Sequence, residues 1–180
     1  MTIAQKLDRF YTENNLAENG GENEDFFSLQ FKYFSLKLPN SDFRKKIVYI
    51  HDIQHILFDC DTTWKGEAYI AGWEIATGIW KHFPIGIMSI WAMGFSFLIH
   101  PKEVIKGYKK GLKYHGLIDQ NISKESIMNL SLDEVNELLL KNNPSNFSKT
   151  KLIIWLTIAL LFFFGPFMLL IALSTFFLVY

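Results

Sequence analysis

The sequence predicts an all-α protein: a helical domain followed by a C-terminal transmembrane segment. Apolar residues recur at helical spacing through most of the chain, and no run alternates polar and apolar residues as a half-buried strand would. The last 29 residues, 152–180, carry no charged side chain. We therefore expect an N-terminal helical segment (1–40), a helical domain (41–141), a linker (142–151) and a membrane anchor (152–180).

Local signals place the first helices. The stretch "IAQKLDRFYTENN" predicts a short amphipathic helix, which the glycines of "NGGENE" end. Phe27, Phe31 and Phe34 then recur at helical spacing and predict one apolar helix face. Ser41 is a suitable N-cap for a helix over 42–58.

The next helix is expected to start near Glu67, after the interruption "DCDTTWKG". Pro84 and Pro101 mark two further helix starts, since proline suits the first turn. The sequence "SLDE" at 131–134 is a capping box, which predicts a helix running through Leu140.

The uncharged tail predicts a membrane anchor. As a straight helix it would be about 43 Å long, against roughly 30 Å of hydrocarbon, so we expect tilting or a kink at Gly165-Pro166. A single span and a tight re-entrant hairpin both fit its length. Lys149 and Lys151 precede the tail, and positive charge favours the cytoplasmic side. The charged N-terminus has no apolar signal region. We expect a single-pass protein of the inner (cytoplasmic) membrane with its main domain in the cytoplasm.

A second apolar run, 83–99, is shorter and contains glycines. We expect it to be a buried helix or the wall of an apolar cavity, because charged segments flank it on both sides. A basic stripe follows, which favours either anionic headgroups or a solvated helix face. The candidate groove residues are Met88, Trp91, Met93, Phe95 and Phe97, and the stripe comprises Lys102, Lys106, Lys109, Lys110 and Lys113.

The overall composition excludes some functions. Eighteen basic and eighteen acidic residues cancel, so no net field attracts nucleic acid. A single cysteine, Cys60, rules out an intramolecular disulfide framework. The aromatic content of 16% favours a large apolar core, a lipid ligand or a membrane.

The stretch "HDIQHILFDCDTTWKGE", residues 51–67, gathers polar side chains that can bind a metal. On a helix His51, Asp52 and His55 fall at roughly 0°, 100° and 40°, on one side. Histidines at i and i+4 can bind one ion, and Glu67 follows a loop that can fold back. Two histidines with a carboxylate suit one divalent ion, zinc or iron. Ordinary surface histidines with solvated acids are the alternative, and a zinc protease is disfavoured because Asp52 is too short a base. Glu74 is expected to be a surface acid or to support the site.

This motif, HDxxH followed by eleven residues and Glu, resembles the signature of the coenzyme Q (ubiquinone) biosynthesis protein four family. The downstream "PIGIMSIW", "GYKKGL" and "LDEVNELL" occur in the order which that family shows, over about residues 42–141. Carried over by position, the resemblance assigns His51, Asp52, His55 and Glu67 as metal ligands. No catalytic residue is assigned.

The resemblance implies a membrane-associated, all-α protein that binds a prenylated aromatic lipid. The family is associated with replacing the C1 carboxylate of a prenylated 4-hydroxybenzoate by a hydroxyl group, which would make this chain a metal-dependent oxidative decarboxylase. The family has also been viewed as a non-catalytic, lipid-binding scaffold for other quinone-synthesis enzymes. Both functions are open at this point.

Overall fold

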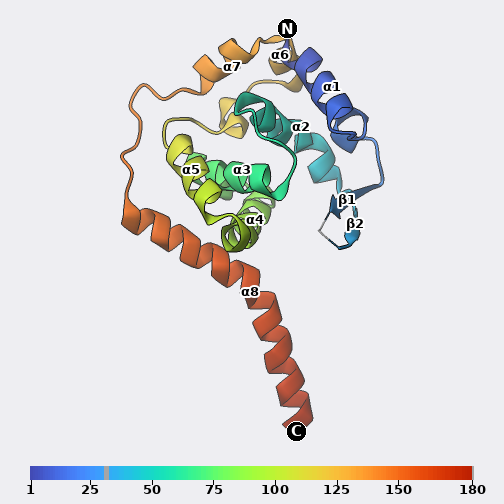
Figure 1. Cartoon of the computed structure of the whole chain (residues 1–180), viewed down its shortest axis with the longest axis vertical. Helices are drawn as coiled ribbons and strands as arrows, with labels where there is room; N and C mark the ends of the chain where they lie inside the picture. The colour runs from blue at the N-terminus through green and yellow to red at the C-terminus, as the bar shows by residue number, and fades with distance from the viewer. Residues whose placement is uncertain (31–32, 180) are drawn as a thin grey trace. The chain divides into compact units, whose positions relative to one another are not determined.

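A computed structural model describes residues 1–30 and 33–179, and α-helices make up most of it (Figure 1). The all-α prediction is therefore confirmed. The chain forms two compact units. Unit 1 combines Met1–Cys60 with Asn121–Leu138, and unit 2 combines Asp61–Gln120 with Leu139–Tyr180. The domain expected over 41–141 is thus divided between them.

Unit 1 is built from capped helices. The predicted first helix is α1 (Ile3–Glu13), which Thr2 begins through a capping box with Gln5. Ser41 caps α2 (Asp42–Leu57), as expected, because its side chain accepts a hydrogen bond from the Arg44 backbone N–H. The short helices η1 (Glu18–Gly21) and α6 (Lys124–Asn129) complete this part. The "SLDE" capping box begins α7 (Leu132–Leu139), and in it the Glu134 carboxylate accepts a hydrogen bond from the Ser131 backbone N–H.

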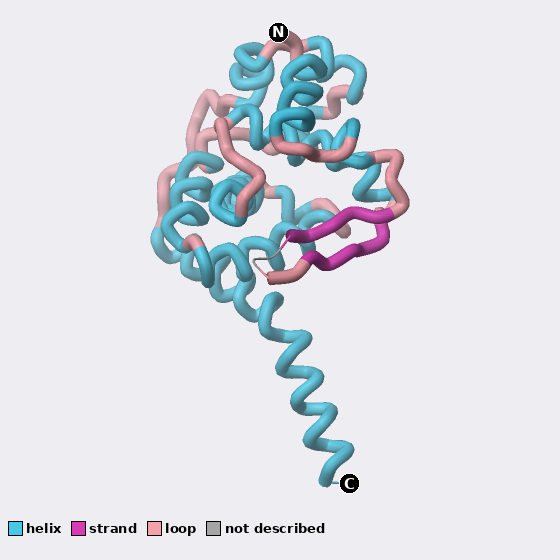
Figure 2. The backbone as a smooth tube through the Cα atoms, turned by 45° about the vertical axis from the view of Figure 1, so that its right-hand side comes forward, coloured by secondary structure: helices cyan, strands magenta, loops and turns pink. Residues whose placement is uncertain are grey.

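Residues 26–39 contain a β-hairpin where the sequence predicted a helix. Figure 2 shows its strands, β1 (Phe26–Gln30) and β2 (Ser35–Pro39), running antiparallel. Phe27 lies in β1 and Phe34 precedes β2, so the predicted helical face is wrong; Phe31 lies outside the described residues.

Two features explain the hairpin. Its register places Phe27 opposite Leu38. Apolar residues recur at every second position along the strands, which is the period of a β-strand. The helical spacing of the three phenylalanines concealed this period of two. The Asn40 side chain donates to the backbone carbonyls of Gly21 and Glu24, at 2.8 Å each. Asn40 thereby closes the base of the hairpin.

Unit 2 is organised around α3 (Trp64–Thr77), which packs against both α4 (Ile85–Ile99) and α5 (Pro101–Gly111). Gly107 lets α5 approach closely, since a Cβ there would collide with the backbone of Tyr69. Two short 3-10 helices, η2 (Ile79–Lys81) and η3 (Leu117–Gln120), follow α3 and α5 respectively. The helix starts expected at Pro84 and Pro101 are confirmed.

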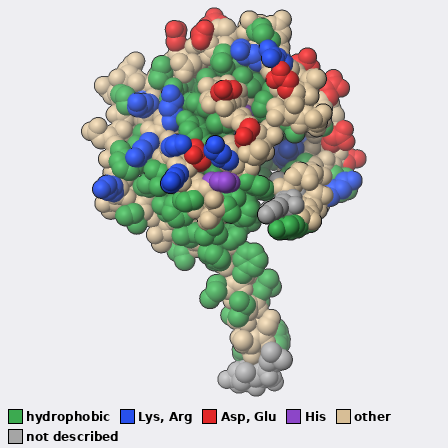
Figure 3. All heavy atoms as spheres, viewed as in Figure 1, with side chains coloured by type: hydrophobic (Ala, Val, Ile, Leu, Met, Phe, Trp, Pro, Cys, Tyr) green, Lys and Arg blue, Asp and Glu red, His purple; other side chains and the backbone are tan. Residues whose placement is uncertain are grey.

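The tail forms one long helix, α8 (Lys149–Val179), which changes direction along its length in Figure 1. It is a single helix rather than a hairpin, and Pro166 lies inside it. Among the described residues, Lys149–Phe177 is long and apolar enough to cross a membrane. Its first half packs on α4, and Leu152 and Ala159 belong to the core there. Figure 3 shows hydrophobic side chains along the rest of this helix.

Candidate metal centre

The helical geometry of α2 brings two histidines of unit 1 together. His51 and His55 are one turn apart, and their Nε2 atoms lie 3.1 Å from each other. Two metal–nitrogen bonds of about 2.0–2.1 Å at a tetrahedral angle would separate the nitrogens by roughly 3.3 Å. The pair therefore fits the two-histidine ligation that the spacing predicted. The same distance also suits a hydrogen bond from one ring to the other.

The His55 ring is fixed in place on its other side. Its Nδ1 lies 3.3 Å from the backbone carbonyl oxygen of Cys60, and the side chain is 2% exposed. When Nδ1 carries the ring proton, its N–H donates a hydrogen bond to this carbonyl, and Nε2 then presents a lone pair toward His51. Cys60 thus contributes through its backbone, and the Cys60 N–H also bonds to the His55 carbonyl at 2.9 Å.

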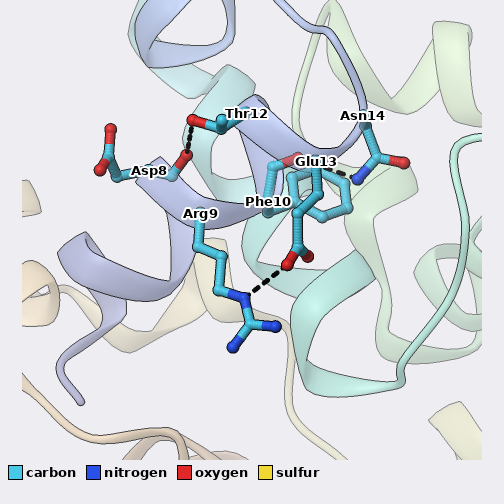
Figure 4. Close-up of polar contacts among 6 residues, drawn as sticks. All are labelled: Asp8, Arg9, Phe10, Thr12, Glu13 and Asn14. Atoms are coloured by element: carbon cyan, nitrogen blue, oxygen red, sulfur yellow. Dashed lines mark hydrogen bonds and ion pairs between the residues drawn. The ribbon is translucent and has the colours of Figure 1, made fainter.

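Phe10 of α1 covers the ring of His55. The two rings stack with centroids 5.8 Å apart and an interplanar angle of 30°. Figure 4 shows how the end of α1 is held: the Asn14 side chain donates to the Phe10 carbonyl oxygen at 2.8 Å. Two neighbouring contacts are also drawn there. The Thr12 hydroxyl donates a hydrogen bond to the Asp8 carbonyl oxygen, and Arg9 and Glu13 form an exposed ion pair.

Asp52 is buried and faces α1 and η1. Its Oδ2 accepts a hydrogen bond from the Tyr11 hydroxyl at 2.9 Å, and a Cβ at Gly20 would come within 2.6 Å of the same oxygen. Burial raises the pKa of the Asp52 carboxyl above its usual value, while His51, the Tyr11 hydroxyl and His55 act in the opposite direction. Ligation by Asp52 stays a prediction.

Tyr11 is a site residue that the sequence did not single out. It lies on the buried face of α1 with Ile3 and Leu7, at the spacing of an apolar stripe. That spacing indicates burial, but only the fold shows that its hydroxyl meets Asp52, a residue 41 positions away.

Glu67 belongs to unit 2 and lies in the first turn of α3. The loop before it is held by Asp61, whose Oδ1 accepts hydrogen bonds from the Thr63 hydroxyl and backbone N–H at 2.5 and 3.0 Å. These bonds, the hydroxyl first, lower the pKa of the Asp61 carboxyl. Thr63 then caps α3 through the Lys65 N–H. The structure thus brings His51 and His55 together within unit 1, and ligation by Glu67 stays a prediction.

The remaining candidates lie in unit 2. Glu74 is 4% exposed and accepts a hydrogen bond from the Ser89 hydroxyl at 2.7 Å, so its expected place as a surface acid is wrong. Met93 is fully buried in the core, whereas Met88 is 49% exposed. The three aromatic candidates also lie against neighbouring side chains. Trp91 and Phe95 contact Phe163 of α8, and Phe97 packs against the core.

Comparison of the chain with models of known protein families, with curated proteins and with solved structures finds no match. The resemblance to the ubiquinone-biosynthesis family thus rests on the motif at 51–67 and the segments that follow it.

Proposed function

We propose that the protein is a membrane-anchored, metal-dependent enzyme of ubiquinone biosynthesis. Its reaction would replace the C1 carboxylate of a prenylated 4-hydroxybenzoate intermediate by a hydroxyl group. The observation that carries the proposal is the approach of the His51 and His55 Nε2 atoms to 3.1 Å on α2. The reaction class comes from the motif resemblance.

The ligand set of this proposal is His51, Asp52, His55 and Glu67, around one zinc or iron ion. Residues 58–63 are the whole link between α2 and α3, so the chain keeps Glu67 within a short tether of His55. No cysteine belongs to the set, and structural zinc sites commonly use cysteine. A set of imidazole and carboxylate ligands with open positions is typical of a working site, where the ion supplies an electrophile for the substrate carboxylate or phenolate.

The chain's own residues would prepare this site. A hydrogen bond to the Cys60 carbonyl would favour the His55 tautomer with its proton on Nδ1, and Phe10 stacks on that ring. Exchange of carboxylate for hydroxyl releases carbon dioxide and oxidises the ring by two electrons, so an oxidant such as dioxygen is required.

The anchor agrees with a lipid substrate. A prenylated ring partitions into the bilayer, and α8 would keep the enzyme there. Lys149 and Lys151 before the apolar stretch favour an orientation with the main body in the cytoplasm, at the inner membrane. The substrate would reach the site from the membrane surface, and other quinone-synthesis enzymes are the expected neighbours.

Metal analysis tests the site first. Full-length protein is purified in detergent without added metal, and zinc and iron are quantified per chain. We expect about one ion in the wild type and none in the variant His51→Ala/His55→Ala. The matched control is His100→Ala/His115→Ala, which removes two histidines outside the motif. Equal metal content in both double variants would refute the site.

A lipid-binding scaffold is the second candidate, because α4 and α8 present exposed apolar side chains such as Ile87, Met88 and Ile153. The variant Glu67→Gln separates the two functions. An enzyme loses turnover of the prenylated acid while remaining folded and membrane-bound, whereas a scaffold keeps its partners in co-purification.

Ligand binding gives a second criterion. An analogue of prenylated 4-hydroxybenzoate should bind the metal-loaded protein more tightly than the metal-free protein. The unprenylated acid should bind far more weakly, since each buried methylene contributes about 0.8 kcal/mol. Equal affinity with and without metal, in folded protein, would favour the scaffold.

A further inference from the structure

Unit 2 contains a basic cavity that the metal site does not use. The cavity has a volume of about 250 Å³ and lies between the end of α3, the segment after α7 and the start of α8. Three lysines line it, Lys81, Lys141 and Lys151, together with two tryptophans, Trp80 and Trp155.

The lysines reach the cavity from three separate segments of the chain. Lys81 ends η2, just after Gly78 stops α3 in a left-handed conformation with φ of 100°. Lys141 lies beside the segment that follows α5, where its backbone N–H donates to the Lys113 carbonyl at 2.9 Å. Lys151 lies in the first turn of α8, and its N–H donates to the Ser148 hydroxyl at 3.3 Å.

The positive charge of the cavity is balanced only in part, through Asp119 near Lys141. Within the described part of the chain, none of the three ammonium groups forms an ion pair with a carboxylate. Burial, and then the charge of Lys81, lower the pKa of Lys141, while Asp119 acts in the opposite direction. The Asp119 carboxylate already contacts the His82 ring at 2.7 Å. An anion in the cavity would relieve the repulsion between the lysines.

The cavity lies where α8 begins its apolar stretch. The ring centroids of Trp80 and Trp155 lie 5.1 Å apart, and Ile153 and Ile154, which precede Trp155 in α8, are exposed. Tryptophan and lysine together are typical of the headgroup level of a membrane. On the face shown in Figure 3, basic side chains lie next to the hydrophobic ones beside α8.

We propose that this cavity binds the phosphate group of an anionic membrane lipid. The ammonium groups of Lys81, Lys141 and Lys151 would contact the phosphate oxygens, with the two tryptophans at headgroup level and the acyl chains outside, along α8. Phosphate is the ligand chemistry, because several ammonium donors can surround its oxygens. A free phosphate ion is the other possible source, and the test below distinguishes it. The proposal does not depend on the metal site.

The test uses full-length protein in a neutral detergent and a short-chain phosphatidylglycerol, with short-chain phosphatidylcholine as the zwitterionic reference. The pocket variant is Lys81→Gln/Lys141→Gln. The matched control is Lys102→Gln/Lys106→Gln, which removes two charges on α5 outside the cavity. We expect the pocket variant to bind phosphatidylglycerol at least about tenfold more weakly than the wild type, and the control to bind within about twofold. Equal losses in both variants would overturn the proposal, because attraction would then follow total charge.

Two further measurements complete the test. Lys151→Gln changes an exposed side chain at the cavity and should also weaken lipid binding, by at least about threefold, without affecting folding. Its failure to do so would count against the site. Inorganic phosphate should compete with the lipid only at far higher concentration. Competition at equal concentration would assign the cavity to a soluble phosphate compound and overturn the lipid proposal.

Discussion

The helices α4 and α8 are both uncharged over their apolar stretches, yet the structure uses them differently. Helix α4 lies against α3 and α8, and it buries small and polar residues, including Gly86, Ser89, Gly94 and Ser96. The second half of α8 is exposed along its described side chains, and nothing lies within 4 Å of a Cβ placed at Gly165.

The difference shows what distinguishes a packed apolar helix from one that is long and apolar enough to cross a membrane. Small residues in α4 allow close helix approach, as at Gly94, where a Cβ would collide with the carbonyl oxygen of Ala159. The hydroxyl of Ser89 donates a hydrogen bond to the buried carboxylate of Glu74. The second half of α8 instead carries large side chains on all sides, which suits lipid. Hydrophobicity alone does not separate the two; the positions of small residues do.

Truncation should give the largest effect. A chain ending at Phe164 keeps the half of α8 that packs on α4 but loses the exposed half. We expect this chain to remain folded and to be released from membranes by high-salt or alkaline washing, since fewer than the roughly 20 apolar residues of a span remain. Fractionation followed by immunoblotting measures the release.

A chain ending at Asn146 provides the comparison. It also loses Leu152 and Ala159 from the core, so we expect lower thermal stability than for the longer truncation. If the chain ending at Phe164 still resists washing, the exposed face of α4 holds the membrane and α8 is not the sole anchor.

The second prediction compares one glycine from each helix, Gly94 of α4 and Gly165 of α8. Gly94→Leu places a side chain into the contact with Ala159, so we expect the free energy of unfolding to fall by about 3 kcal/mol. Gly165→Leu adds the same atoms in open space and should change it by no more than about 1 kcal/mol. Denaturant titration in mild detergent compares the two, and equal destabilisation would contradict the packing of α4 on α8.

The sequence predicted the fold where a local signal exists. Caps and prolines, such as Ser41, Pro84 and Pro101, gave the helix starts, because these residues satisfy or replace backbone groups within one turn. The hairpin was missed because Phe27 and Phe34 also fit helical spacing, while strand pairing depends on partners in the other strand.

The candidate site divides in the same way. The spacing of His51 and His55 predicts their approach, because one helical turn determines it. The contacts that orient the site could not be predicted. The hydrogen bond from the Tyr11 hydroxyl to Asp52 joins segments that are far apart in the sequence. The Cys60 carbonyl lies near the His55 ring only because the chain after α2 folds back.

The smallest effect is expected for two serines that distinguish the same pair of helices. Ser89 of α4 donates to the Glu74 carboxylate at 2.7 Å, and both side chains are buried. Ser89→Ala removes a donor from a buried acid, so we expect the free energy of unfolding to fall by about 1–3 kcal/mol. Ser174 of α8 only bonds to the Leu170 carbonyl of its own helix, at 2.8 Å, and Ser174→Ala should change it by less than about 0.5 kcal/mol.

A double-mutant cycle shows whether the effect passes through the acid. A Glu74→Met background contains no carboxylate at this position, so the Ser89 hydroxyl has no acid to bond to. Ser89→Ala should therefore lower the free energy of unfolding by less than it does in the wild type. Denaturant titration of the four proteins in the same detergent gives the coupling free energy. A cost of Ser89→Ala that is the same in both backgrounds would mean that the serine acts by packing alone. In that case the buried hydrogen bond would not be what separates α4 from the exposed half of α8.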